Sequence, residues 1–396
     1  MKKKLQAPAE IKTVNVSADR KIAPDILRLV ACFSVMSIHF FLNSGYYSEA
    51  IEGFGMIAML ALRLFVTTCV PVFIILTGYL VSHKTLSKKY YSNGMKVIWL
   101  YLLSSAAVII YRVWIRKNLA FGAALWGILR YNTAPYAWYV EMYIGLFLMI
   151  PFLNILYKNI PERRWKLVLI LTCGSLSLLP CIVNVYNFTV PGWWSDPTLS
   201  TDYQRLIPQW WFFGYPITYY FIGAYLREYG TKLGKVTRRC LLVVTLAVYT
   251  LYCLWRAGGG VFPGGYCTGW EFPLNAVNAA LFASIMLEKK FARIPKGAGR
   301  FISYLSGLTL SAFLVSYIFD NEFYVILKQL LPVFPERLWG YFVIVPAVFI
   351  CSLALAAVID LIYRLLSRLY KKVKGAVVSR KQAKQIGLDE HSEPAQ

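Results

Sequence analysis

Charged residues are scarce in this chain. Of its 396 residues only 15% are Asp, Glu, Lys or Arg, whereas 58% are hydrophobic and the mean hydropathy is +0.52. Soluble globular domains carry about a quarter charged residues and about half apolar ones. The scarcity of charge excludes an ordinary soluble domain, and the long apolar runs predict an integral membrane protein that crosses the bilayer many times.

Cysteine motifs are absent and histidines are few. The eight cysteines are dispersed without a CxxC pair, so nothing supports a zinc or redox centre and we expect no bound metal. Cys181 and Cys267 both fall near the predicted external face. They either form a disulfide or are two small apolar side chains, and the second interpretation is favoured. Of the three histidines, only His39 lies within an apolar run.

Acidic residues are too few to balance the basic ones, and the net charge of +23 raises the question of a nucleic-acid partner. Its distribution argues against one: about 32 of the 42 Lys and Arg fall in the termini and alternate connections, and about eight in the other connections. This alternation predicts an all-α bundle of about ten transmembrane helices with both termini cytoplasmic. The apolar windows are 22–43, 54–82, 95–115, 137–157, 166–186, 209–227, 239–256, 271–287, 301–319 and 338–363.

The two ends of the chain are polar. Met1-Lys-Lys-Lys precedes a polar stretch, so we expect no cleavable signal peptide. We expect a basic cytoplasmic tail at 1–21, a single transmembrane domain at 22–366, and a basic then polar cytoplasmic tail at 367–396. The basic residues of both tails could bind anionic lipid, but their favoured role is to orient the chain in the membrane.

Arg28 and His39 are eleven residues apart in the first apolar run. At about 3.6 residues per turn they leave the same helix face, roughly 16 Å apart along the axis. Because ionisable groups are costly in a membrane, we expect a shared function: Arg28 binds phosphate and His39 acts as a base. The alternatives are a histidine that only hydrogen-bonds a neighbouring helix, and an arginine that pairs with Asp25 or reaches the cytoplasmic surface.

Three further features have two interpretations each. Arg63 lies deep in the second apolar run and needs a partner or a hydrated cavity. Glu141 either orients an imidazole or neutralises Arg63. Thr77 and Gly78 allow close approach of either a neighbouring helix or a substrate.

Two connections predicted to be external have distinctive compositions. The connection 187–211 combines tryptophan, tyrosine and aspartate, which suits carbohydrate but is also typical of the aromatic belt at membrane interfaces. The glycine-rich stretch 257–266 has no following lysine, which argues against a nucleotide cradle and favours a flexible cover over an acceptor.

Five ordered segments carry a more specific signal: Arg28-x10-His39, Arg63-x7-Pro71-Val-Phe73-x3-Thr77-Gly78-Tyr79, Trp138-Tyr139-x5-Gly145-Leu146-x4-Pro151, Tyr220-Phe-Ile-Gly223-Ala-Tyr-Leu226 and Leu310-Ser-Ala-Phe-Leu-Val-Ser316. In this order they resemble the membrane acyltransferase-3 family, multipass O-acyltransferases of bacterial surface glycans. Ser316 stands where a second histidine is common in the family. No fused esterase-like domain, which some members carry, follows the last apolar run, so transfer is expected to be direct or to use a separate partner.

The resemblance implies a bacterial plasma-membrane enzyme with no permanently bound cofactor. An acyl-CoA, most commonly acetyl-CoA, would donate from the cytoplasm to a hydroxyl of an extracytoplasmic or lipid-linked glycan, with membrane lipid and glycan-assembly proteins as surroundings. His39 would be a base or a transient acyl carrier, Arg28 and Glu141 would assist it, and the substrate-binding residues would be Arg63, Thr77, Gly78, Tyr79, Trp138 and Tyr139. The alternatives are a surface-polysaccharide exporter or flippase and an accessory subunit of a polymer-secretion complex; the few, grouped intramembrane charges favour the enzyme.

Overall fold

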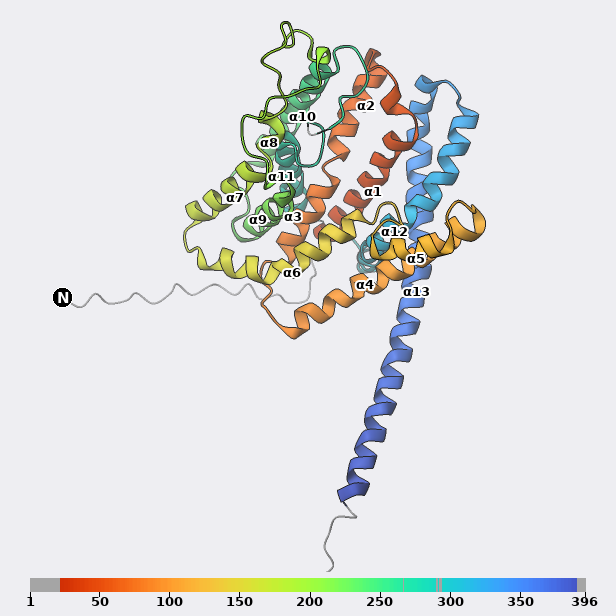
Figure 1. Ribbon diagram of the computed structural model, residues 1–396. Coiled ribbons are helices and arrows are strands. Elements are labelled where there is room, and N and C mark those ends of the chain that lie inside the picture. The colour runs from red at the N-terminus through yellow and green to blue at the C-terminus, as the bar shows by residue number, and fades with distance from the viewer. Residues whose placement is uncertain (1–21, 266, 290, 292–293, 390–396) are drawn as a thin grey trace, which may run out of the picture.

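The computed structural model describes residues 22–265, 267–289, 291 and 294–389. In these residues every named element is helical, and the only strand-like feature is an isolated bridge between Ala50 and Val261 (Figure 1). The α-helices are α1 (Ala23–Asn43), α2 (Gly53–Val66), α3 (Cys69–Val81), α4 (Lys88–Ile109), α5 (Phe121–Leu129), α6 (Trp138–Asn159), α7 (Arg163–Ser177), α8 (Pro180–Val183), α9 (Tyr215–Tyr229), α10 (Lys235–Ala257), α11 (Pro273–Leu287), α12 (Lys296–Leu330) and α13 (Phe334–Asp389). The short elements are η1 (Tyr46–Ser48), the π-helix η2 (Ile110–Ile115), η3 (Pro197–Leu199) and η4 (Phe212–Gly214). The predicted all-α class is confirmed.

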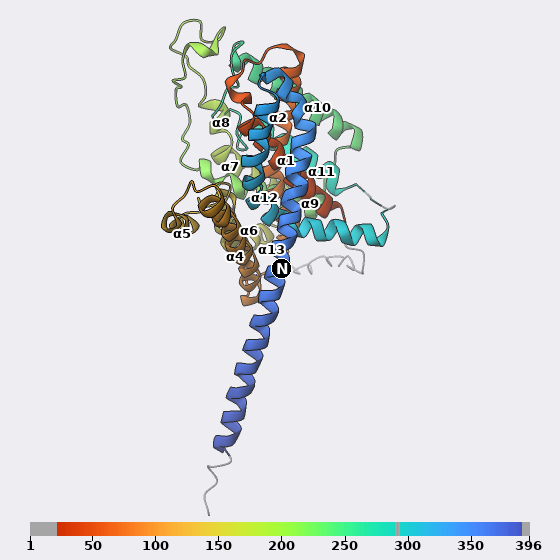
Figure 2. The ribbon, with the colours of Figure 1, turned by 90° about the vertical axis from the view of Figure 1, so that its right-hand side faces the viewer.

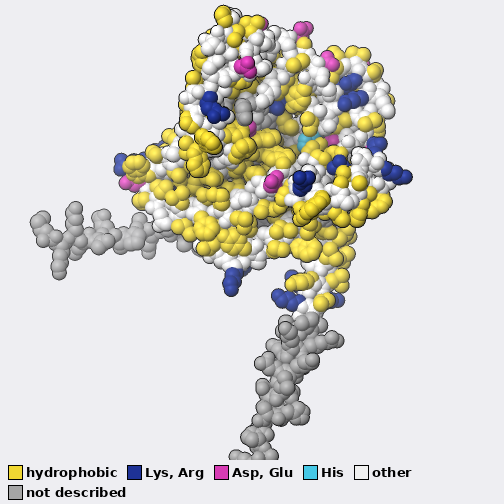
Figure 3. All heavy atoms as spheres, in the orientation of Figure 1, with side chains coloured by type: hydrophobic (Ala, Val, Ile, Leu, Met, Phe, Trp, Pro, Cys, Tyr) yellow, Lys and Arg dark blue, Asp and Glu magenta, His cyan; other side chains and the backbone are white. Residues whose placement is uncertain are grey.

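Seven segments of the described chain are long and apolar enough to cross a membrane: Ala23–Asn43, Gly53–Val81, Lys88–Ile115, Trp138–Lys158, Lys235–Ala257, Lys296–Leu330 and Phe334–Lys374. Hydrophobic side chains cover much of the face in Figure 3, as a membrane protein requires. The other three predicted spans correspond to α7, α9 and α11, which have 15 residues each. At about 1.5 Å per residue they reach roughly 22 Å, short of the ~30 Å hydrocarbon core. The count of ten is therefore not confirmed.

Proline explains why these three helices are shorter than their apolar windows. The first window contains Pro180, and α7 ends at Ser177 before the short helix α8 begins at that proline. Pro216 and Pro273 lie at the first positions of α9 and α11, where a missing N–H costs nothing. Hydropathy counts apolar side chains, whereas helix boundaries depend on backbone hydrogen bonding.

The second predicted span is interrupted between α2 and α3, at Thr67 and Thr68. Pro71 explains the break, because it has no N–H to donate to the carbonyl of Thr67 and its ring crowds that carbonyl. The Thr67 carbonyl instead accepts a hydrogen bond from Asn275 Nδ2 at 3.4 Å. The break places Arg63, in the last turn of α2, beside the N-terminal end of α11.

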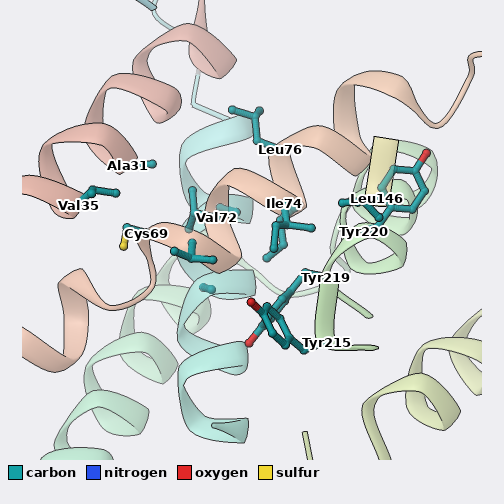
Figure 4. Packing of buried hydrophobic residues seen from close by; sticks show 14 of the residues in the cluster. Ala31, Val35, Cys69, Val72, Ile74, Leu76, Leu146, Tyr215, Tyr219 and Tyr220 are labelled. Atoms are coloured by element: carbon teal, nitrogen blue, oxygen red, sulfur yellow. The ribbon is translucent and has the colours of Figure 1, made fainter. Parts of the chain in front are cut away.

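The bundle core is formed where α1 packs against α12, α3 and α13, and where α3 packs against α9. Figure 4 shows this apolar packing, from Ala31 and Val35 on α1 to Tyr219 and Tyr220 on α9. A Cβ at Gly78 would overlap the carbonyl oxygen of Tyr220. The close approach of α3 and α9 therefore requires glycine at position 78, which favours the helix-packing interpretation of that residue.

Helix α13 extends well beyond the other helices in both ribbon views (Figures 1 and 2). Its 56 residues correspond to a length of roughly 84 Å. The expected tail at 367–396 thus begins inside a helix that continues to Asp389, whereas the expected tail at 1–21 and residues 390–396 lie outside the described residues.

The eight cysteines all lie in the described residues and are free thiols. Cys181 and Cys267 are both buried and unbonded to each other. The favoured interpretation of two small apolar side chains is consistent with this, and the disulfide left open by the sequence is absent.

Candidate active site

A cavity of about 530 Å³ lies within the bundle, walled mainly by α1, α3, α4, α6 and α12. Its volume falls within the roughly 300–1,000 Å³ typical of sites for small molecules. Arg28 and His39 both line it, as their spacing on one helix face predicts. Most other lining side chains are apolar, so the cavity is a largely apolar passage with a cation toward the N-terminal end of α1 and an imidazole toward the other end.

His39 is buried and held by a carboxylate on α12. Its Nδ1 lies 2.9 Å from Oδ2 of Asp320, and the hydroxyl of Tyr136 donates to the same oxygen at 2.8 Å. The Tyr136 ring also stacks on the imidazole, with ring centroids 3.8 Å apart and planes 25° apart. The second carboxylate oxygen, Oδ1, is buried without a hydrogen-bond partner in the described chain. The three side chains thus fix one another in a buried position.

This geometry selects the tautomer of His39. An ionised carboxylate can only accept a hydrogen bond, so Nδ1 carries the hydrogen and Nε2 keeps its lone pair. A neutral imidazole of this kind can accept a proton at Nε2 while the Asp320 carboxylate stabilises the resulting cation. The arrangement is therefore suited to general-base catalysis.

Ser316 lies beside the same imidazole. Its Oγ is 3.5 Å from His39 Nδ1 and donates a 2.9 Å hydrogen bond to the carbonyl of Phe313. Ser316 and Asp320 are four residues apart, so both project from one face of α12 toward α1. Ser316, which the resemblance placed at the position of a second histidine, therefore lies beside the imidazole of His39.

Contacts between α1 and α12 also organise the Arg28 end of the cavity. Arg28 Nη1 donates to Ser306 Oγ at 2.8 Å and lies 3.5 Å from Asp25 Oδ1. Ser303 and Ser306 donate to the two oxygens of Asp25 at 2.6 and 2.9 Å. The expected pairing of Asp25 with Arg28 is thus present, and it does not prevent the guanidinium from lining the cavity.

The comparison with protein families decides the identity of this bundle. The acyltransferase-3 model, described as an acyltransferase domain, matches residues 21–361. The chain belongs to the membrane acyltransferase-3 family. The searches of curated proteins and of solved structures returned no match.

Three of the predicted substrate-binding residues of this acyltransferase line the cavity with His39: Thr77, Trp138 and Tyr139. Trp138 stacks on Trp270, with centroids 4.7 Å apart and planes 14° apart. Both rings of this aromatic pair form part of the cavity wall. These residues are in position to contact a bound group.

The other predicted residues of the acyltransferase lie elsewhere. Gly78 lies at the crossing of α3 and α9, and the carbonyl of Tyr79 accepts a 2.9 Å hydrogen bond from Arg227. Arg63 lines a second cavity. Glu141 is exposed on α6, and the carboxylate on the imidazole is Asp320.

Three residues of the site were not predicted from the sequence. Asp320 and Tyr136 contact His39, and Lys96 lines the main cavity. Asp320 is one residue beyond the apolar window 301–319, and Tyr136 is one residue before the window 137–157. A usable signal existed for Asp320, since it follows Ser316 by one helical turn and α12 continues to Leu330. Among the described residues no group of three or more His, Cys, Asp or Glu side chains could hold a metal ion.

Proposed function

We propose that this protein is an O-acyltransferase that moves an acyl group, acetyl above all, from acyl-CoA to a hydroxyl of a glycan. The observation that carries the proposal is His39 in a cavity, backed by Asp320, with that cavity continuing to Arg28. Family membership supports acyl transfer. The location of the reaction is a bacterial plasma membrane, with the Arg28 end of the bundle facing the cytoplasm.

In this mechanism the donor enters at the Arg28 end. Arg28 and Lys96 both line the cavity and bind the phosphates of coenzyme A, with Arg28 keeping its contact with Asp25. The thioester arm extends along the apolar wall toward His39. Thr77, Tyr139 and Trp138 contact the arm and the acyl group, and water is excluded from the thioester by the apolar lining.

His39 Nε2 removes the proton of the acceptor hydroxyl as its oxygen attacks the thioester carbonyl. The new C–O ester bond forms and the C–S bond breaks. The thiolate of coenzyme A then takes the proton from His39, which regenerates the base. A route through a transient acyl-histidine uses the same nitrogen as nucleophile and differs only in which atom first accepts the acyl group.

The experiment is complementation of a deletion strain with wild type, His39→Ala or His83→Ala, followed by mass spectrometry of O-acyl groups on envelope glycans. His83 is the control, because it lies in the connection between α3 and α4. We expect wild type and His83→Ala to restore an ester and His39→Ala, at equal membrane levels, to restore none. Restoration by His39→Ala would remove the imidazole from the mechanism.

Consumption of acetyl-CoA by the purified protein separates the enzyme from the exporter and accessory-subunit alternatives. Loss of the thioester in the presence of envelope glycan supports transfer. A change in polymer export without any consumption of acyl-CoA would instead support an exporter. Family membership does not favour that alternative.

A further inference from the structure

A second cavity of about 310 Å³ lies next to the first, between the end of α2 and the described residues 262–265 and 268–270. Ile38 and Trp270 line both cavities, so these two side chains form their common wall. Ile38 immediately precedes His39 on α1. The second cavity therefore lies beside the imidazole, at the end of the bundle remote from Arg28.

Arg63 contributes the charge of this cavity. Its Nη1 donates to the carbonyl of Thr268 at 2.7 Å and to Thr67 Oγ1 at 3.2 Å, and its Nε donates to the hydroxyl of Tyr47 at 3.3 Å. The guanidinium carbon lies 4.2 Å from the centroid of the Phe262 ring. All of these partners are uncharged.

No carboxylate of the described residues lies within ion-pair distance of Arg63. Glu271 is close to Gly269, which lines the cavity, and burial raises the pKa of its carboxyl group, but no ion pair joins Glu271 to Arg63. A guanidinium inside a membrane protein is costly without a counter-ion or water. Nη2 makes no hydrogen bond within the described chain, which leaves a donor for a ligand.

Glycines leave room around this charge. Gly264, Gly265 and Gly269 line the cavity and place no side chain in it. A Cβ built on Gly264 or Gly265 would meet no atom within 4 Å. As far as the described residues extend, the space beside Arg63 is therefore open, and its wall offers backbone groups as well as the aromatic faces of Phe262 and Trp270.

We propose that the second cavity binds the acyl acceptor through an oxyanion, a carboxylate or phosphate carried by a sugar, with Arg63 as its counter-ion. Arg63 can form the two parallel hydrogen bonds that such groups accept once its Nη1 exchanges a neutral partner for the ligand. The hydroxyl to be acylated then passes between Ile38 and Trp270 to His39. This inference rests on the proposed function, which it extends by separating donor and acceptor into adjoining cavities and by assigning the acceptor a negative charge.

Binding is tested on the purified full-length protein in detergent by saturation-transfer NMR, without acyl-CoA. The probes are glucuronate, glucose 6-phosphate and glucose. We expect at least one anionic sugar to bind wild type at least about tenfold more tightly than glucose does, a difference of about 1.4 kcal/mol. Glucuronate alone would identify a carboxylate and glucose 6-phosphate alone a phosphate; equal binding of all three sugars, or none, would overturn the proposal.

Two variants and one control locate the site. Arg63→Gln removes the charge and should abolish the preference for anionic sugars, and Arg63→Lys should retain part of it. Arg337→Gln is the control, because Arg337 also donates to backbone carbonyls near the same end of the bundle, those of Leu331, Pro332 and Ser44. Retention of the preference in Arg63→Gln would contradict the proposal.

A second variant decides the question if Arg63→Gln fails to fold. Gly264→Phe keeps Arg63 and adds a side chain where a Cβ has free space, so it should fold and reduce binding of the anionic sugar at least about fivefold by filling the cavity. Unchanged binding in Gly264→Phe would overturn the proposal. His39→Ala should bind the anionic sugars as wild type does while transferring no acyl group. Loss of sugar preference tests the acceptor site, and loss of acyl transfer tests the catalytic assignment, so the two proposals can fail independently.

Discussion

The imidazole of His39 depends on two side chains that come from distant parts of the chain. Asp320 fixes its tautomer, and Tyr136 both donates to Asp320 and covers one face of the ring. The effect of each group is separable by substitutions that preserve shape.

Asp320→Asn keeps the volume of the side chain but removes its charge. The amide stabilises the imidazolium poorly and can donate to Nδ1, which would leave the hydrogen on Nε2 and remove the base. We expect kcat to fall by about 10²–10⁴-fold, the usual contribution of general-base catalysis, with little change in KM for the donor. Steady-state assays with acetyl-CoA measure both constants.

Glu322→Gln is the matched control for Asp320→Asn. Glu322 lies on the same helix two residues later and is 40% exposed, where it pairs with Arg116 rather than with the site. Its kcat should stay within about twofold of wild type, since exposed pairs contribute little. Equal losses in the two variants would mean that α12 is merely sensitive to charge removal.

Tyr136→Phe removes one hydrogen bond and keeps the ring stacked on His39. A single hydrogen bond contributes about 0.5–1.5 kcal/mol, so kcat should fall roughly 2- to 13-fold. Tyr136→Ala also removes the ring, so its kcat should be lower still. If kcat of the Phe variant matched that of the Ala variant, the stacked ring would have no role of its own.

Sequence patterns predicted Arg28 and His39 as site residues but did not predict Asp320. Arg28 and His39 lie on one helix, where the period of 3.6 residues relates sequence to space directly. Asp320 is 281 residues away from His39, and no local period reports which helices become neighbours. Glu141 was the nearer acid in the sequence, whereas the parallel packing of α1 on α12 brings Asp320 to the ring.

Helices α3 and α9 cross at two glycines, one on each helix. A Cβ at Gly78 would overlap the carbonyl of Tyr220, and a Cβ at Gly223 would overlap the carbonyl of Ile75. Close crossings of this kind stabilise helix pairs in membranes, where water supplies no driving force between helices.

Gly78→Ala should therefore destabilise the fold by about 1–3 kcal/mol or more, as overpacking does. We expect a lower Tm in detergent and a lower level in the membrane, with donor KM unchanged in the protein that folds. Gly145→Ala on α6 is the control, since a Cβ there meets no atom within 4 Å and Tm should not fall. A normal Tm with a raised KM for Gly78→Ala would restore its role in substrate binding.

The helix boundaries mark where hydropathy is informative and where it is not. The windows 22–43 and 271–287 match α1 and α11 to within two residues, because their prolines, Pro24 and Pro273, lie in the first turn, where the missing N–H has no helical partner to lose. The windows around Pro71, Pro180 and Pro216 differ from the helices, since hydropathy carries no information on which backbone carbonyls lose a donor.

At the scale of the whole molecule, the proposed reaction requires opposite exposure of the two ends of the bundle. The connection between α3 and α4 belongs to the Arg28 end, and residues 184–214 belong to the other end (Figure 1). Thr85 and Thr201 are exposed in these two connections.

Thr201→Cys should react with a membrane-impermeant maleimide on intact cells, and Thr85→Cys only after the cells are permeabilised. Both belong in a variant with Cys240 replaced by serine, because Cys240 is the exposed native thiol and the other seven are buried or half-buried. Labelling is measured by a mass shift on gels. Reaction of Thr85→Cys on intact cells would invert the orientation and place Arg28 away from the cytoplasmic donor.

The projecting part of α13 has a practical consequence for imaging. A 45.2 kDa protein embedded in a detergent micelle offers few features for aligning single particles by electron microscopy. A helix of roughly 84 Å is nearly three times as long as the ~30 Å hydrocarbon core, so part of it stands clear of the micelle. A globular fusion or an antibody fragment on that segment would give each particle a recognisable mark on one side of the micelle. The mark would show in each image which side of the bundle carries Arg28 and which carries His39.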